Sequence, residues 1–269
     1  MTTLTPRPAF LTAENAARFA DAGVAEAYPH RLPYAPETID VLVGLVVGDP
    51  PSAAVLDIGA GTGDLARPLA ARVGRVDALD PSAPMIAKGR SLPGGDAPNL
   101  RWLHGRAEDA PIGGPYALIA AGESLHWMGW EVVLPRLADA VAPGAVLAIT
   151  NREWVPPPWQ EGLMALIEAH STLTTWHTYD LIGLLEERGL FRRAGMWSSE
   201  PVRTRQRVVD YVESYHSRSS LTRSALTAES AATFDAGVRA VVAPWAEDAT
   251  VETASVSHIT WGYPSGGRA

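Results

Sequence analysis

The spacing of hydrophobic and polar positions changes along the chain and divides it into three parts. Residues 1–50 contain two stretches with helical spacing, about 12–27 and Glu37–Val47, on either side of the Pro-rich connector YPHRLPYAP. Residues 51–151 alternate short apolar runs with helical stretches, and residues 152–269 follow a less regular pattern. We therefore expect an N-terminal helical segment, a regular core and a C-terminal remainder.

The middle part predicts a parallel β-sheet covered by helices on both faces. Its apolar runs have the length of buried strands, and helical stretches separate them. Helices are expected to begin near Asp64, to cover SAPMIAKGR, and to run from about Trp130 to Val141. This alternation is typical of a doubly wound α/β sheet. The five expected strands are AAVLDI, RVDALD, NLRWLHG, YALIAAGE and AVLAITN.

The part after Asn151 predicts additions to this scaffold. The loop EWVPPPWQ leads to two expected helices, at about 158–171 and 178–188, and to a strand near 193–203. Helical segments are expected over about 206–244, and the alternating segment VETASVSHITWGY predicts a closing strand. Irregular additions to a rigid sheet are where binding specificity usually lies.

Composition narrows the class of protein. The 269 residues are 46% hydrophobic and 19% charged, which is typical of a globular protein with a sizeable core. The sequence has no apolar run of membrane-spanning length and no signal-peptide pattern, so we expect a cytoplasmic protein without a membrane partner. It has no cysteine and no metal-ligand spacing among its histidines, so no metal is expected. A net charge of −8 argues against a nucleic-acid partner.

Three glycines stand close together in the segment VLDIGAGTGDLA, between a predicted strand and a predicted helix. Gly59, Gly61 and Gly63 allow a ligand to approach the backbone closely. Their spacing, G-x-G-x-G, differs from the dinucleotide fingerprint G-x-G-x-x-G, whose third glycine would fall on Asp64. Asp57, just before the turn, would repel a pyrophosphate and suits a cationic group.

A second acid supports the same interpretation. Asp80 ends the second predicted strand, 17 residues after Gly63, where a carboxylate can accept hydrogen bonds from both ribose hydroxyls. S-adenosylmethionine (SAM) has an ammonium, a sulfonium, a ribose and an adenine, but no phosphate. Together Asp57 and Asp80 favour SAM over a nicotinamide dinucleotide.

Four segments resemble the class I SAM-dependent methyltransferases. VLDIGAGTGDLA resembles their first motif, ALDPSAPMI their ribose-binding segment, GRAEDAP their adenine-edge motif and AAGESLHWM the segment lining the methyl-transfer site. YPHRLPYAP is similar to the start of a small-molecule subgroup that includes trans-aconitate and juvenile-hormone-acid methyltransferase relatives. The resemblance implies a Rossmann-like seven-stranded sheet with an antiparallel last strand and helical insertions. It also implies that residues 1–50 form a lid and residues 51–151 the SAM-binding core.

The resemblance further implies a set of site residues. The glycine turn and Asp57 would hold the methionine part of SAM, Asp80 the ribose, and Ala107 with Glu108 the adenine. Met85 either packs against the adenine or belongs to the core. The expected cofactor-binding residues are Tyr28, Arg31, Asp57, Gly59, Ala60, Gly61, Gly63, Asp80, Pro81, Met85, Ala107, Glu108 and Gly122.

Two candidate bases and several aromatic residues follow. His126 comes after the fourth strand, at the carboxyl edge of the sheet, and is either a general base or a helix-capping residue. Glu123 is the second candidate base. Aromatic side chains either wall an apolar substrate pocket or pack ordinary helices. The expected substrate-binding residues are Trp127, Trp154, Trp176, Tyr211 and Tyr215.

These observations predict a SAM-dependent methyltransferase that acts on an oxygen, carbon or nitrogen atom of a small organic molecule, such as a secondary metabolite or a carboxylic acid. The alternative is a SAM-binding protein of the same fold that catalyses a rearrangement or cyclisation without methyl transfer, or that serves as a binding partner. The acidic composition argues against RNA as the acceptor.

Overall fold

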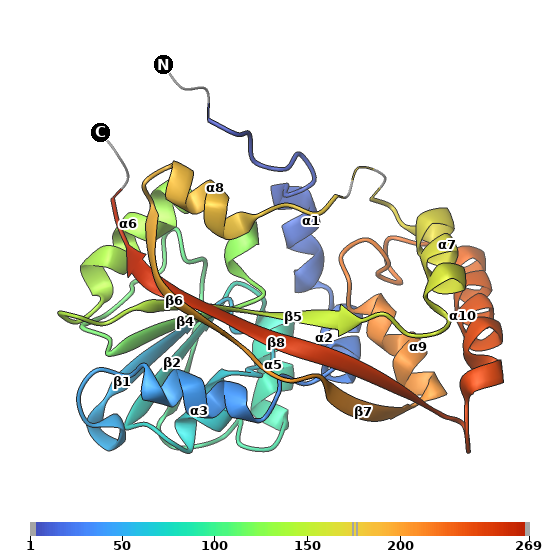
Figure 1. The fold of residues 1–269 in the computed structure, drawn as a ribbon, viewed down its shortest axis with the longest axis horizontal. Coiled ribbons are helices and arrows are strands. Elements are labelled where there is room, and N and C mark those ends of the chain that lie inside the picture. Colours follow the sequence, from blue (N-terminus) through green and yellow to red (C-terminus); the bar gives the residue numbers. More distant parts are fainter. Residues whose placement is uncertain (1–3, 174, 176, 267–269) are drawn as a thin grey trace.

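The strands assemble into one mixed sheet with helices on both faces (Figure 1). The structure, a computed structural model, describes residues 4–173, 175 and 177–266. The strand order is β3-β2-β1-β4-β5-β8-β6, with β7 also paired to β8. The strands are β1 (Ala54–Ile58), β2 (Arg75–Asp80), β3 (Leu100–His104), β4 (Leu118–Gly122), β5 (Leu147–Val155), β6 (Phe191–Ser198), β7 (Val202–Arg207) and β8 (Thr250–Pro264).

Strand directions follow the expected pattern. The strands β1 to β5 pair in parallel. The last strand, β8, lies between β5 and β6 and is antiparallel to both, with Ile259 opposite Thr150 on one side and Trp197 on the other. The predicted doubly wound, Rossmann-like α/β fold with an antiparallel last strand is confirmed.

Helices occupy both faces and one end of the sheet. In Figure 1, α3 lies on one face, α6 and α8 lie on the other, and α7, α9 and α10 gather beyond one end. Within the described part of the chain, no helix combines the length and apolar composition needed to cross a membrane. The α-helices are α1 (Ala13–Ala17), α2 (Ala22–Ala27), α3 (Glu37–Gly44), α4 (Ala66–Ala70), α5 (Ala83–Ser91), α6 (Trp130–Ala140), α7 (Gln160–His170), α8 (Leu181–Glu187), α9 (Val208–His216) and α10 (Ala228–Val242). The 3-10 helices are η1 (Arg18–Ala20), η2 (Tyr28–His30), η3 (Pro50–Ser52), η4 (Leu125–Trp127) and η5 (Ala243–Trp245).

The central strand β1 shows why the sheet is covered on both faces. Leu56 and Ile58 are fully buried in a cluster with Leu137 of α6, whereas Val55 is buried in a second cluster with Leu42 of α3. Burial of each such side chain contributes about 1.5–3 kcal/mol. The continuous apolar run is therefore a consequence of burial on both sides.

The helices α7, α9 and α10 have a hydrophobic core of their own. Trp159 and Leu163 pack there with Tyr215 of α9 and with Phe234 of α10. In this group α7 follows β5, α9 follows β7 and α10 precedes β8, and the group lies beyond the end of the sheet where these three strands extend furthest (Figure 1). The sheet thus positions a separate helical wall.

The predicted edge strand at 193–203 is wrong in one respect, because it is two strands. The strand β6 ends at Ser198 and β7 begins at Val202, and both pair with β8. Between them, Pro201 lacks an N–H and cannot donate a ladder hydrogen bond. The interruption raises the strand number to eight, while the expected seven strand positions are kept.

The predicted single helix at about 12–27 is also wrong, because the chain breaks at Asp21. Asp21 is extended, with φ −72° and ψ 132°, and its carboxylate accepts hydrogen bonds from the N–H groups of Gly23 and Val24. A side-chain cap of this kind starts a new helix. The Ala-rich sequence continues the helical spacing across this break, which is why the pattern missed it.

Candidate functional site

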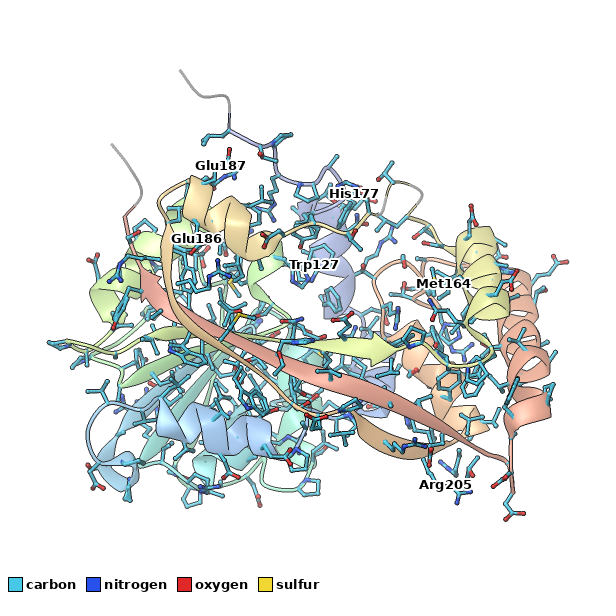
Figure 2. All side chains as sticks on the ribbon, viewed as in Figure 1. Trp127, Met164, His177, Glu186, Glu187 and Arg205 are labelled. Carbon is cyan, nitrogen blue, oxygen red and sulfur yellow. The ribbon has the colours of Figure 1, made fainter. Side chains whose placement is uncertain are left out.

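A cavity of about 1940 Å³ lies at the carboxyl ends of the parallel strands. Its floor includes Gly61 after β1, Asp80 at the end of β2 and Ser124 after β4. Figure 2 labels Trp127 of η4, beside α1, and Met164 on α7, which both line it. A pocket for one small ligand usually measures about 300–1,000 Å³. The space therefore has room for two ligands side by side.

Each position of the glycine turn requires glycine for a different reason. Gly59 and Gly61 have φ values of 64° and 56°. A Cβ on Gly59 would lie 2.4 Å from Cβ of Ser124, so Gly59 allows two loops to meet. The atoms nearest to a Cβ on Gly61 would belong to the side chain of Tyr28, at an ordinary contact distance of 3.5 Å. Gly61 is therefore the position where a ligand in the cavity can approach the backbone.

Glycine is required at position 63 because of close packing, and this residue does not line the cavity. Its φ is 82°, and a Cβ there would lie 2.7 Å from the indole of Trp102. It is not among the residues that line the cavity. This glycine fits the turn against β3.

Asp80 fixes the turn and faces the cavity. One carboxylate oxygen accepts the N–H of Gly61 at 2.7 Å, and the other accepts the N–H of Ser82 at 2.8 Å. Burial raises the pKa of Asp80, and these two hydrogen bonds oppose the rise. Each oxygen has a second lone pair, so the carboxylate can still accept from a ligand.

Asp57 lies beneath the turn rather than in the large cavity. It is 1% exposed and lines a separate void of about 10 Å³ together with Tyr34 and Arg152. Its Oδ1 has no hydrogen-bond partner among the described residues. Burial and the nearby charge of Asp80 raise the pKa of Asp57 to about 8. The void has the size of a single water molecule.

The remaining expected cofactor residues divide between these two spaces. Glu108 accepts the N–H of Gly129 at 2.8 Å, which ties the adenine-edge segment to the start of α6. Met85 is 2% exposed and packs with Val24 and Tyr28. Lining the large cavity are Tyr28, Arg31, Gly59, Gly61, Asp80, Pro81, Met85, Ala107 and Glu108, and lining the small void are Tyr28, Asp57, Gly59, Ala60 and Gly122.

Glu123 is held in an ion pair that sequence reasoning missed. Its carboxylate accepts from Nε of Arg152 at 3.2 Å and lies 3.9 Å from Nη1 of Arg31. Burial alone would raise the pKa of Glu123, but the charges of Arg152 and Arg31 lower it to about 2. A carboxylate with this pKa is a weak base, so the structure argues against Glu123 as a proton acceptor. Its backbone φ of 52° also marks a constrained position.

Arg152 could have been found from strand order. The last pair between β4 and β5 joins Gly122 to Thr150. Glu123 comes directly after this pair on one strand, and Arg152 comes two residues after it on the other. Neighbouring parallel strands bring such residues together at one edge. Arg152 also donates to the carbonyl of Leu32 and lies with its Cζ 4.2 Å from the ring centre of Tyr34. The ion pair therefore joins the N-terminal connector to the sheet.

His126 lines the cavity from η4. Burial and the positive charges of Arg31 and Arg7 lower the pKa of His126 to about 4. The negative charge of Glu123 raises the pKa but does not offset these effects. The imidazole is neutral at pH 7 and can accept a proton. Arg7 fixes this loop by donating to the carbonyl oxygens of His126 and Met128, at 2.7 and 2.8 Å.

The expected aromatic residues are only partly at the cavity. Trp127, Trp154 and Tyr211 line it. Tyr215 does not: it is fully buried, and its hydroxyl donates to the hydroxyl of Tyr211 at 2.8 Å. Tyr215 is therefore a core residue, and not one of the residues that line the expected substrate pocket. Trp176 lies outside the described residues.

Arg218 is a further cavity residue that the sequence did not reveal. It follows α9 and lies with its Cζ 4.0 Å from the ring centre of Trp154. The surrounding segment, SRSS, has no motif that distinguishes this arginine from a surface residue. Across residues 4–173, 175 and 177–266, no three His, Cys, Asp or Glu side chains converge in a way that would hold a metal ion.

Comparison with known proteins gives the family of the middle part. Residues 55–144 match a family model described as a methyltransferase domain. An uncharacterized methyltransferase of Mycobacterium tuberculosis H37Rv is 34% identical over 114 residues, which are 42% of this chain and 56% of that protein. The trans-aconitate 2-methyltransferase of Deinococcus radiodurans is 34% identical over 107 residues, 39% of this chain and 40% of that protein. The chain thus spans about half the length of these curated relatives.

Solved structures extend the similarity to most of the fold. A candidate type II methyltransferase from Anaeromyxobacter dehalogenans has a TM-score of 0.60 at 19% identity, covering 87% of this chain and 97% of that one. A SAM-dependent methyltransferase from Geobacter sulfurreducens, in complex with S-adenosyl-L-homocysteine, has a TM-score of 0.51 at 17% identity, covering 88% and 95%. These similarities show the fold.

Proposed function

Because the chain belongs, by its methyltransferase domain and its fold, to the class I SAM-dependent methyltransferases, we propose that it transfers a methyl group from SAM to a small organic molecule. The observation that carries the proposal is the pairing of Asp80 with Gly61 at the cavity floor. A carboxylate with free lone pairs stands there beside the side-chain-free backbone of Gly61, which the ring of Tyr28 borders. This is the chemistry that a ribose and an amino-acid tail require.

The cofactor part of the cavity is assigned as follows. Asp80 accepts hydrogen bonds from the ribose hydroxyls, and the backbone at Gly59 and Gly61 borders the methionine part. Met85 and Ala107 give the adenine an apolar contact, and Glu108 borders its edge. When bound, SAM supplies an electrophilic methyl group on its sulfonium. Asp57 lines the small void beneath the turn and does not line the large cavity, so it supports the glycine turn rather than contacting SAM directly.

The acceptor part of the cavity lies toward α7 and α9. Trp127, Trp154 and Tyr211 give it apolar walls, which exclude water and align the acceptor. His126, neutral at pH 7, accepts a hydrogen bond from a hydroxyl or acidic-carbon acceptor and takes its proton as the methyl group is transferred, whereas a carboxylate acceptor needs no base. Glu123 serves as a positioning residue, because it holds Arg152 and Arg31 in place.

Three arginines support the assignment of residues 1–50 as a lid. Arg7 reaches the loop at His126, Arg18 donates to the carbonyl of Ser219 at 2.8 Å, and Arg31 donates to that of Ser217 at 2.7 Å. These hydrogen bonds tie the N-terminal part to both sides of the cavity. Residues 1–50 would in this way close over the two ligands. The net charge of −8 fits a small-molecule acceptor better than a nucleic acid.

Calorimetry with S-adenosylhomocysteine tests the cofactor assignment. Replacing Asp80 removes hydrogen bonds to a charged acceptor, so Asp80→Ala should weaken binding by at least about tenfold. Asp40→Ala is the matched control, because Asp40 is exposed and pairs with Arg72 at the surface. Equal affinity in the two variants, both still folded by circular dichroism, would remove Asp80 from the site.

Incubation with methyl-labelled SAM and a fractionated extract of the host tests the reaction itself. Label in a small extractable compound is the expected result. Label in RNA or protein would overturn the acceptor class. Tight binding of S-adenosylhomocysteine without transfer of label to any fraction would favour the non-methylating alternative.

A further inference from the structure

Arg218 carries a positive charge into the acceptor part of the cavity, where none of the described carboxylates pairs with it. Its side chain is partly buried and lines the cavity. Among the described residues, its guanidinium forms no ion pair within 4 Å; its contacts are the faces of Trp154 and Tyr215, with ring centres 4.0 and 5.0 Å from Cζ. Burial lowers the pKa of Arg218, yet a guanidinium remains charged. An anion in the cavity would stabilise such a charge.

Glu123, the acid whose charge acts on Arg218, is already engaged, and so is Asp64, which shares Arg152 with Glu123. Glu123 binds Arg152 and is near Arg31, and Asp64 binds Arg67 at 3.1 Å and lies 3.6 Å from Arg152. Glu161 and Glu168 of α7 also line the cavity but are exposed, so solvent screens their charges. Arg218 therefore has no carboxylate of its own among the described residues.

The surroundings of Arg218 are otherwise suited to an apolar molecule. Trp154 and Val155 of β5, Met164 and Ile167 of α7, and Leu173 line the same part of the cavity. Met164, labelled in Figure 2, is 46% exposed although it is apolar. An apolar wall with one charged group fixes both the orientation and the charge of its ligand.

We propose that Arg218 binds a carboxylate of the acceptor molecule, while Trp154 and the apolar wall contact the rest of that molecule. The stacking on Trp154 holds the guanidinium plane in place, so that its N–H groups can bind both carboxylate oxygens. A carboxylate presents two oxygens in one plane, which matches the planar fork of a guanidinium. The inference rests on the proposed function only for the statement that the bound molecule is the methyl acceptor.

The test compares carboxylic acids with their own amides. Phenylacetate, 4-phenylbutyrate and decanoate, and the primary amide of each, are titrated into the protein with and without saturating S-adenosylhomocysteine. At least one acid should bind at least about tenfold more tightly than its amide, because the amide lacks the charge-assisted hydrogen bonds. Equal binding of acid and amide in all three pairs would overturn the proposal.

Two variants assign the preference to Arg218. Arg218→Met keeps an apolar stem against Trp154 but removes the charge, so it should abolish the preference for the acid. Arg218→Lys, which keeps the charge without the planar group, should retain part of it. Arg205→Met is the matched control at an exposed arginine outside the cavity, labelled in Figure 2, and should keep the full preference.

The outcomes separate the two proposals. If S-adenosylhomocysteine does not bind the wild-type protein, the proposed function fails, and the acid and amide titrations without it still decide the role of Arg218. If S-adenosylhomocysteine binds equally to wild type and Arg218→Met while both show the same acid preference, only the role of Arg218 is overturned. A phosphate ester, 4-phenylbutyl phosphate, that binds more tightly than 4-phenylbutyrate would overturn the choice of a carboxylate.

Discussion

Replacing Asp57 by asparagine should make folding stability less dependent on pH. Asp57 is 1% exposed, and burial together with the charge of Asp80 raises its pKa to about 8, against 3.8 for an ordinary aspartate. The folded protein therefore binds a proton that the unfolded chain has released at neutral pH. The stabilisation from that proton is complete below pH 3.8 and is lost as pH rises toward 8.

The expected magnitude follows from the same two pKa values. Each pH unit between them lowers the unfolding free energy by about 1.4 kcal/mol. From pH 5.5 to 7.5 the wild type should therefore lose up to about 2.7 kcal/mol through Asp57, and Asp57→Asn should lose none of it. The amide oxygen can still accept the hydrogen bond from the N–H of Ala66. The variant should thus become more stable than the wild type toward alkaline pH.

Urea unfolding of the ligand-free protein at pH 5.5 and 7.5 measures this difference. The control is Asp40→Asn, because Asp40 has an exposed side chain and pairs with Arg72. The control should follow the wild-type pH dependence. Parallel curves for wild type and Asp57→Asn would show that Asp57 is already ionised in the folded protein, and the argument from burial would fail.

Three further predictions concern the loop around β4 and the glycine turn. Glu123→Gln should cost about 3 kcal/mol by chemical denaturation, because Arg152, whose side chain is 5% exposed, loses its hydrogen-bonded counter-charge and keeps only Asp64 among the described acids, at 3.6 Å. Glu252→Gln, at an exposed pair, should cost less than about 1 kcal/mol, and similar losses would contradict the argument. With an alcohol acceptor, His126→Phe should lower turnover about 100-fold, and wild-type turnover should stay constant from pH 6 to 9 because the pKa of His126 is about 4. A transition near pH 6.5 would show an ordinary histidine. Gly59→Ala should destabilise the protein more than Gly144→Ala in thermal unfolding, because both have positive φ but only Gly59 meets another side chain, at 2.4 Å; equal losses would mean that backbone strain alone matters.

The sequence predicted the sheet well because its signals are local and repeated. Short apolar runs such as AAVLDI, followed by helical stretches, are sufficient for a parallel sheet buried on both faces. The errors arose where a single side chain overrides the pattern. Asp21 caps a second helix within an Ala-rich stretch, and Pro201 interrupts an edge strand. Neither residue changes the hydrophobic spacing around it.

The candidate site was predicted unevenly for a similar reason. Residues in the strand-turn-helix motif, such as Gly61 and Asp80, were found because the motif fixes their geometry. Arg152 and Arg218 were missed because their partners, Glu123 and Trp154, are distant in sequence. Aromatic residues cannot be divided into wall and core from spacing, since Tyr211 and Tyr215 lie one helical turn apart with different exposure to the cavity.

The extended end of the sheet has a mechanical consequence. Beyond Thr150, where β4 stops pairing, β5 continues for five residues against β8, and β7 flanks the other side of β8. The helix α7 follows the tip of β5, and α9 follows β7 directly. From Thr250 to His258 this arm is about 26 Å long at about 3.3 Å per residue, so a bend of about 5° at its base moves the tip by about 2 Å. The twist of these three strands therefore sets the distance of α7 and α9 from the rest of the sheet. We expect a substitution in their hydrogen-bonded ladder, far from any ligand, to change the width of the acceptor pocket.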